Sequence, residues 1–360
     1  MVTGLFKKAL SLTRVYAMAL VASPSLASAV EELPEHQQRP IRNAAPEQPR
    51  VAPKKARTVL IFNTPDHLYA NDPHKGYCVP YGSYAMQALG KKSGAFRPVV
   101  SSDLAMFLPE NIKRFDAIVL NNTAGPWITP SDADIKRAEF HKHGADKDAV
   151  EQVLRQSLLD YVSAGGGLVA YHFATGANQH WPEYHRLLGA KFTGHPWNEE
   201  VGIKVDEPSH PLVAAFGGKD FPLADEIYEF GDPYDRRRLR VLLSLDTAKT
   251  NMNVKWIQRS DGDFAQAWVK SYGQGRVFYA GFGHRDGSPD RDWPGRFRGR
   301  RSTDRERGGK NIIEPRCQHR LVADGVGPWG ARSVLGPRPS CRTIRAFVGY
   351  SAAWRFRTAR

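Results

Sequence analysis

Four histidines carry the chemistry that this sequence offers most plainly. Each stands where the chain leaves a predicted strand or enters a loop: His172, His195, His210 and His284. Carboxylates lie near them in the sequence, namely Glu199, Glu200, Asp225, Glu226, Glu229 and Asp286. Imidazole and carboxylate groups serve both general acid–base catalysis and metal ligation. A single histidine of this kind is more often a hydrogen-bonded structural residue, so the four count only as a set.

A metal site is an alternative that the sequence leaves open and does not predict. The histidines have no HExxH spacing, and Cys78 has no CxxC partner. Cys78 also does not follow a buried strand at a sharp turn, so an inert thiol is favoured over a nucleophile. We therefore predict no metal site, leave the cofactor unknown, and keep a divalent ion on His172, His195 and His284 as the alternative.

Polar and aromatic side chains near the same strand ends offer contacts for a sugar. Asn121 could hydrogen-bond a polyol, although Asn after a strand also caps or turns the chain. Trp197 and Tyr171 could stack on a sugar ring, although aromatic residues beside strands more often belong to the core. Both interpretations of each residue stay open.

The elements that must position these residues follow from short apolar runs. Residues 59–62 are continuously apolar, as expected of a strand buried on both faces. Further strands are predicted at 98–100, 117–120 and 168–171, and helices at 81–89 and 149–164. This alternation predicts an α/β domain with a doubly wound, mostly parallel sheet. Ligands of such sheets bind beyond the carboxyl ends of the strands, which places Asn63, Asn121 and His172 near one crevice.

The pattern changes after His172. A helix is predicted at 181–188 and strands at 201–205, 227–230 and 241–243. Residues 265–269 and 276–280 flank the turn Tyr272-Gly273-Gln274-Gly275, which predicts a hairpin.

The N-terminal segment predicts export. Residues 1–29 have basic residues, a short apolar run (15–22) and a small-x-small cleavage site at Ala27-Ser28-Ala29. That run is far shorter than the ~20 residues of a spanning helix. We expect a periplasmic or secreted protein with no membrane span after cleavage. Residues 30–57 hold five prolines and predict a polar linker.

The C-terminal segment accounts for most of the basic charge. Residues 287–360 hold 16 Arg and 1 Lys against 6 acidic residues, a net of +11 out of +14 for the chain. A charge confined to one tail does not indicate a nucleic-acid-binding domain, so no nucleic-acid partner is predicted. Two interpretations of this Arg-rich tail stay open. It is either a basic extension for an acidic partner or an aberrant translation, and the second is favoured because nothing in it is patterned for packing.

Several segments together resemble the trehalose-utilisation (ThuA-like) family. They are Gly165–His172, Trp181–Tyr184, Leu188–Ala190, Gly194–Trp197, His210-Pro211, Asp225–Tyr228 and Gly281–Arg285. Their order and spacing make the resemblance specific, and it covers residues 58–286. It does not extend into the tail, where the family places a closing helix. The resemblance implies a single domain of the class I glutamine amidotransferase-like (flavodoxin-like) fold, with disordered termini.

The same resemblance implies a set of site residues. Amidotransferases of this fold carry a nucleophilic Cys at the turn after a strand, where this chain has His172, so glutamine hydrolysis is not expected. The family motifs point to His172, His284 and Glu229 as catalytic residues. For substrate binding we expect the residues His195, Trp197, His210, Asn121 and Tyr171.

Three functions are compatible with these residues. The favoured one is an exported enzyme that acts on a sugar or keto-sugar, a small carbohydrate partner, with His172 and His284 as acid and base. The second is a non-catalytic carbohydrate-binding module. The third is a metal-dependent hydrolase. The sequence names neither the sugar nor an oligomeric state.

Overall fold

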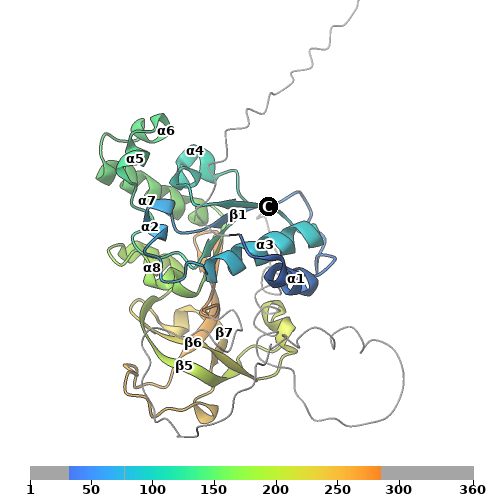
Figure 1. Ribbon diagram of the computed structural model, residues 1–360. Coiled ribbons are helices and arrows are strands. Elements are labelled where there is room, and N and C mark those ends of the chain that lie inside the picture. Colours follow the sequence, from blue (N-terminus) through green and yellow to red (C-terminus); the bar gives the residue numbers. More distant parts are fainter. Residues whose placement is uncertain (1–31, 77, 285–360) are drawn as a thin grey trace, which may run out of the picture.

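The computed structural model describes residues 32–76 and 78–284 of the 360-residue chain. The framework of this part is one nine-stranded sheet with strand order β2-β1-β3-β4-β9-β8-β7-β5-β6. The expected signal peptide (1–29), the Arg-rich tail (287–360) and Asp286 lie outside the described residues. Figure 1 shows one end of the sheet surrounded by helices and the strands β5, β6 and β7 at the other end.

The first five strands of that order form the parallel half of the sheet. They are β2 (Arg97–Ser101), β1 (Thr58–Phe62), β3 (Ala117–Asn121), β4 (Gly167–Tyr171) and β9 (Gly275–Ala280). Every neighbouring pair among them is parallel, so their carboxyl ends meet at one edge. The strands predicted from apolar runs are confirmed here, and they bring polar loops to that edge.

Helices cover both faces of the parallel half because its strands are apolar on both sides. Val59 and Ile61 share a core with α3 (Cys78–Ser93), whereas Leu60 and Phe62 face the other side. That second side is covered by α7 (Lys147–Ser163) and α8 (Pro182–Leu188). Figure 1 shows α3 on one side of the strands and α4 and α7 on the other. The shorter helices are α2 (Asp66–Tyr69), α4 (Pro109–Ile112), α5 (Asp132–Ile135), α6 (Ala138–His141), η1 (Leu104–Phe107), η2 (His172–Gly176), η3 (Pro211–Phe216), η4 (Arg236–Arg238) and η5 (Thr247–Lys249).

The other four strands form the antiparallel half of the sheet. They are β8 (Ala265–Tyr272), β7 (Arg240–Leu245), β5 (Lys191–Val205) and β6 (Phe221–Gly231), and β8 also pairs antiparallel with β9. The expectation of a mostly parallel, doubly wound sheet therefore does not hold for this half, and the sheet is mixed. The physical reason lies in the connections. The predicted hairpin is confirmed, and its turn at Gly273 (φ +57°) is too short for the crossover that a parallel pair needs.

The segment expected to be a polar linker also differs from that expectation. Residues 35–44 form α1 (Glu35–Ala44), which packs on α3. Leu33, Ile41 and Ala45 are buried in the core, and Arg42 donates a hydrogen bond to the Tyr84 hydroxyl at 3.1 Å. A few buried apolar side chains therefore fix this proline-containing stretch.

The other predicted elements agree with the structure. The helix expected at 149–164 is α7, and it begins at an Asp146 side chain that accepts a hydrogen bond from the Ala149 amide. The helix expected at 181–188 is α8, which ends at Gly189 (φ +96°). Over the described ranges, we find no helix with the length and apolar character needed to cross a bilayer.

Candidate functional site

Four buried side chains meet where the two halves of the sheet join. They are His74, His172, Glu226 and His284, and they define the histidine–glutamate cluster. One donor atom from each lies within 4.8 Å of the donor atoms of all the others. The three histidines follow the carboxyl ends of β1, β4 and β9, whereas Glu226 lies within β6. The parallel half therefore contributes loops, and the antiparallel half contributes a strand.

The position of His172 is fixed by its backbone conformation and by hydrogen bonds at its carbonyl oxygen and its ring. It follows β4 directly and has φ +43°, a left-handed conformation that non-glycine residues seldom adopt. Its carbonyl oxygen accepts a hydrogen bond from the Tyr279 hydroxyl at 2.8 Å. Its Nδ1 lies 2.7 Å from the Gly281 carbonyl oxygen, which can only accept. The proton therefore sits on Nδ1, and Nε2 faces the cluster.

Three donor atoms at the centre of the cluster form an equilateral triangle. His172 Nε2, His284 Nδ1 and Glu226 Oε2 are each 3.3 Å from the other two. All three side chains are buried. A short charge-assisted hydrogen bond would have a donor–acceptor distance of about 2.7–2.9 Å. The three contacts are longer than that and equal to one another.

His74 completes the cluster from the long loop after β1. Its ring centroid lies 5.1 Å from that of His172 and 5.4 Å from that of His284. Asp72 holds this residue, because its carboxylate accepts the His74 backbone amide at 2.8 Å and lies 3.5 Å from His74 Nδ1. The Thr64 hydroxyl donates to the other Asp72 oxygen at 2.5 Å. A buried carboxylate thus orients the His74 ring.

Tyr228 brings a hydroxyl group to the cluster from the same face of β6 as Glu226. Its oxygen lies 2.6 Å from His172 Nε2, and its ring stacks on the His172 ring with centroids 4.3 Å apart. Burial, followed by the negative charge of Glu226, raises the pKa of Tyr228 well above its usual value. The hydroxyl therefore stays protonated and can donate a hydrogen bond within the site.

His195 links the cluster to solvent. Its Nδ1 lies 3.3 Å from Glu226 Oε1, the carboxylate oxygen that faces away from the central triangle, and its side chain is 40% exposed. It lies on β5, which pairs with β6 across two register irregularities, on either side of Gly194. Glu226 is therefore shared between two buried imidazoles and one that solvent and solutes can reach.

The charges of the cluster follow from its burial and its close contacts. Burial acts to raise the pKa of Glu226, but the hydrogen bond and charge of His172, followed by His284 and His195, lower it to about 2. Burial, followed by repulsion from His172, lowers the pKa of His284 to about 3 despite the attraction of Glu226. Burial also lowers the pKa of His74. Near neutral pH the cluster therefore offers the ionised carboxylate of Glu226 beside the neutral imidazoles of His74 and His284.

Backbone contacts fix the loop that carries His284. The Gly283 amide donates to the Asp225 carboxylate at 3.0 Å, and Gly283 has φ +127°, which favours glycine. The Cys78 thiol, at the start of α3, lies 2.7 Å from the His284 carbonyl oxygen and donates to it. Cys78 is thus a buried anchor of this loop, in agreement with the inert interpretation of the sequence.

The structure brings only some of the expected site residues together. His172, His195 and His284 meet around Glu226, whereas Glu229 is not a member of the cluster. The Glu229 carboxylate accepts hydrogen bonds from the backbone amides of Gln258 at 3.0 Å and Arg259 at 3.2 Å. It therefore anchors the loop before β8. It lies an odd number of residues from Glu226 along β6, which places the two side chains on opposite faces.

Of the five residues expected to bind a sugar, His195 contacts Glu226 and the other four lie outside the cluster. Trp197 and Tyr171 are buried in the core, and Trp197 Nε1 donates to the Asn251 carbonyl at 2.8 Å. Their rings therefore cannot stack on a bound sugar. The buried Asn121 side chain donates to Asn63 Oδ1 at 2.8 Å and to the Val79 carbonyl at 2.9 Å. His210 caps η3 by accepting the Leu212 amide at 3.3 Å.

Sequence reasoning did not select three residues of this site, His74, Glu226 and Tyr228, although it counted Glu226 among the carboxylates near the histidines. The signal for His74 was its place in a loop after a buried strand, with an aspartate two residues before it. The signal for Glu226 and Tyr228 was their alternation on one strand, which puts both on the same face. The choice between Glu226 and Glu229 needed the knowledge of which face of β6 meets the parallel half.

Comparisons with known proteins add to this geometry. The sequence model of the ThuA family, described as trehalose utilisation, matches residues 59–293. No curated protein matches the chain. A solved ThuA-like protein from Bacteroides uniformis is 23% identical, with TM-score 0.44 over 65% of this chain and 85% of its own. One from Parabacteroides merdae is 17% identical, with TM-score 0.41 over 64% and 80%. A β-galactosidase from Rahnella sp. R3 is 11% identical, with TM-score 0.36 over 63% and 29%.

Proposed function

This chain belongs to the ThuA family of trehalose utilisation, and from that premise we propose that it is an enzyme acting on a sugar or keto-sugar by proton transfer. The family gives a general carbohydrate-related role. The finer statement, that histidine and carboxylate groups carry out acid–base chemistry on the sugar, rests on the site.

One observation carries the proposal: Glu226 pairs with His195 on one oxygen and with His172 and His284 on the other. An imidazole that a carboxylate orients is a common general base, because the carboxylate fixes the ring and stabilises its protonated form. His195 is half-exposed, so it is the imidazole that a substrate in solution can meet. We assign it the proton transfer.

Keto-sugar chemistry suits the remaining groups. A hydrogen on the carbon next to a carbonyl is acidic enough for a base to remove it when the carbonyl oxygen is stabilised at the same time. The Tyr228 hydroxyl is fully buried and lies 2.6 Å from His172 Nε2, so it acts behind the imidazoles. His195 would remove the proton, and Tyr228 would hold the His172 ring in place.

The export of the protein is part of the proposal. It rests on the basic residues, apolar run and small-x-small site of residues 1–29. Cell fractionation followed by mass spectrometry of the N-terminus tests it. We expect a chain that begins at Val30 in the exported fraction, and a cytosolic chain that keeps Met1 would contradict export.

The test of the enzymatic proposal is a turnover assay with disaccharides and their keto forms. We expect product from at least one keto-sugar, and a His195→Gln variant that loses about 100-fold or more in kcat without a change in melting temperature. His67→Gln, an exposed histidine on α2, is the matched control. Full turnover by His195→Gln would contradict the role of His195, and no product from any sugar would contradict an enzyme.

Sugar binding without catalysis is the second candidate, and one observation favours it. Trp256 is 59% exposed in the loop that Glu229 anchors, and the Gln258 side chain ties this loop to the Thr193 carbonyl at 2.9 Å. Thr193 is two residues before His195 on β5, so the loop that carries Trp256 is tied to the strand that carries His195. This candidate predicts saturable binding of a sugar and no product under the same conditions.

A further inference from the structure

We propose that the histidine–glutamate cluster binds a divalent transition-metal ion of the zinc type. His74, His172, Glu226 and His284 would be its ligands. The proposal deepens the proposed function, and the catalytic use of the ion rests on that function, whereas the binding of the ion does not. Its support is geometric: the spacing of the donor atoms, their surroundings and their access to solvent.

The spacing of the central triangle fits a bound ion. Zinc binds nitrogen and oxygen ligands at about 2.0–2.1 Å in a tetrahedral arrangement, so its ligand atoms lie about 3.3–3.4 Å apart. The three contacts among His172 Nε2, His284 Nδ1 and Glu226 Oε2 are all 3.3 Å. One face of a tetrahedron is therefore already formed. His74 is the fourth candidate ligand, and its donor atom lies within 4.8 Å of the other three.

The donor atoms converge with few protons between them. The His172 Nδ1 faces the Gly281 carbonyl oxygen at 2.7 Å, which leaves Nε2 as the ring atom that faces the cluster. The Glu226 Oε2 and His284 Nδ1 atoms face the same point, each 3.3 Å from Nε2. A cation at the centre satisfies all three lone pairs at once, and nitrogen and carboxylate donors favour zinc or a similar ion.

The surroundings of the ligands are those of a built metal site. The Gly281 carbonyl fixes one orientation of the His172 ring, and Asp72 lies against the ring of His74. Such outer contacts orient ligating imidazoles and raise their basicity. The four side chains come from four separate segments of the chain. The buried Asp225 holds the loop that carries His284, because its carboxylate accepts the Gly283 amide.

The site is buried yet open at one point. All four ligands are at most 6% exposed, whereas His195 on the other oxygen of Glu226 is 40% exposed. An ion in the triangle would therefore lie just behind the imidazole that solutes reach. There it would polarise a sugar carbonyl or hydroxyl oxygen as a Lewis acid, while His195 remains available for the proton.

The competing arrangement is a metal-free hydrogen-bonded network. In that network the Tyr228 hydroxyl donates to His172 Nε2, and His284 Nδ1 donates to Glu226. A bound ion would use the same Nε2 lone pair, so the Tyr228 hydroxyl would have to turn to another acceptor. The two arrangements predict different results for direct metal binding.

The test is cobalt and zinc binding by the full chain after treatment with a chelator and dialysis. We expect a single equivalent of Co²⁺ with visible absorption bands of a tetrahedral site, and Zn²⁺ should displace it. Zn²⁺ should also raise the melting temperature, because an ion that binds only the folded state stabilises it. Metal content is measured by mass spectrometry in parallel.

Variants make the test specific. Glu226→Gln and His284→Ala should lose the cobalt bands and the zinc-dependent rise in melting temperature, and His74→Ala should bind at least tenfold more weakly. Tyr228→Phe should keep the bands, and His67→Ala is the exposed control. Absent bands in the folded wild type, or zinc stabilisation of Glu226→Gln equal to that of the wild type, would overturn the proposal. Metal binding without sugar turnover would instead overturn the proposed function alone.

Discussion

The two halves of the sheet contribute to the site in different ways. The parallel half supplies His74, His172 and His284 from loops beyond its strand ends, where the backbone is free to take unusual conformations. The antiparallel half supplies Glu226, Tyr228 and His195 from within β6 and β5, where the pleat of the strand decides which way each side chain points. The first half presents three imidazoles, and the second presents the carboxylate and the hydroxyl.

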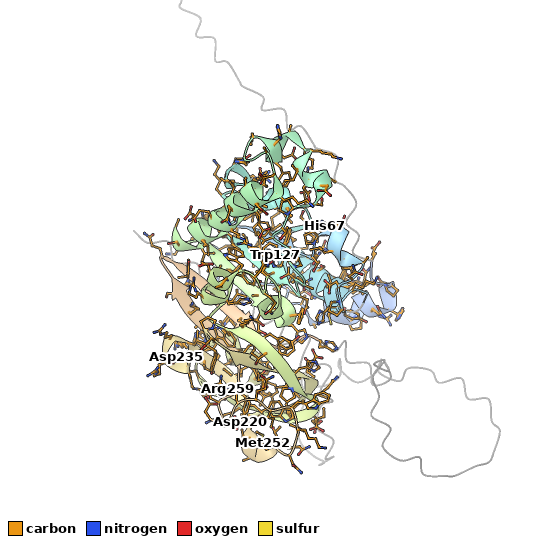
Figure 2. All side chains as sticks on the ribbon, turned by 90° about the vertical axis from the view of Figure 1, so that its left-hand side faces the viewer. His67, Trp127, Asp220, Asp235, Met252 and Arg259 are labelled. Carbon is orange, nitrogen blue, oxygen red and sulfur yellow. The ribbon has the colours of Figure 1, made fainter. Side chains whose placement is uncertain are left out.

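Figure 2 shows His67 and Trp127 among the helices, and Met252 and Arg259 at the other end of the molecule.

This difference predicts that strand residues of the antiparallel half carry the largest single effect on activity. Glu226→Gln removes the charge that both the buried imidazoles and His195 share, so kcat/KM should fall about 100-fold or more with the fold intact. Turnover of a keto-sugar and the thermal melt are the two measurements.

The control for this variant is Glu200→Gln, an exposed glutamate on β5. It should change neither turnover nor melting temperature. If Glu226→Gln keeps more than about a tenth of the wild-type kcat/KM, Glu226 is not the shared catalytic carboxylate and the comparison between the two halves fails.

Glu229, on the face of β6 opposite to Glu226, should affect the stability of the fold and not catalysis. Glu229 accepts two backbone amides of the loop before β8, and Glu229→Gln leaves one of these part-buried donors facing an amide NH₂. We expect a loss of about 2 kcal/mol in the free energy of unfolding, measured by denaturant titration. A variant of unchanged stability that loses turnover would instead place Glu229 in the catalytic machinery.

The loop that Glu229 anchors should affect substrate affinity. Trp256→Ala removes an exposed ring from the loop that is tied to Thr193, and it should weaken sugar binding by about 1 kcal/mol, roughly fivefold in KM, with kcat unchanged. Met252→Ala, the other exposed large apolar residue of this loop, is the control. Equal KM values for both variants would exclude stacking by Trp256.

The smallest expected effect concerns a histidine of the parallel half outside the cluster. Burial, followed by the positive charge of Lys191, lowers the pKa of His185 on α8 to about 4. The unfolded chain binds this proton near pH 6.5 and the folded chain does not. The contribution of neutral His185 to the free energy of unfolding is therefore fully present above pH 6.5, and it is lost as the pH falls towards 4.

Thermal melts between pH 7 and pH 4 check this expectation, because this range covers the unfolded and the folded pKa of His185. The melting temperature of His185→Gln should fall less steeply with acid than that of the wild type. His67→Gln should follow the wild-type curve. Parallel curves for all three proteins would show that His185 does not contribute to the acid sensitivity of the fold.

The sequence predicted the site residues that follow the ends of strands, and it did not predict those whose place depends on which face of a strand they occupy. His172 and His284 were found because an apolar run ends just before each of them. Glu226 and Glu229 stand on one strand, and only the pairing of β5 and β6, with its irregularities, shows which of the two faces the parallel half. The helix α1 was missed for a similar reason, since burial of Leu33 and Ile41 outweighs the local effect of Pro40.

The left-handed backbone at His172 has a consequence for how such a site can evolve. The conformation belongs to the turn between β4 and η2, and it would present whatever side chain stands there to the same point in space. Bulky β-branched residues are excluded by the backbone alone. A thiol placed at this position would therefore replace one reaction chemistry with another without moving a strand.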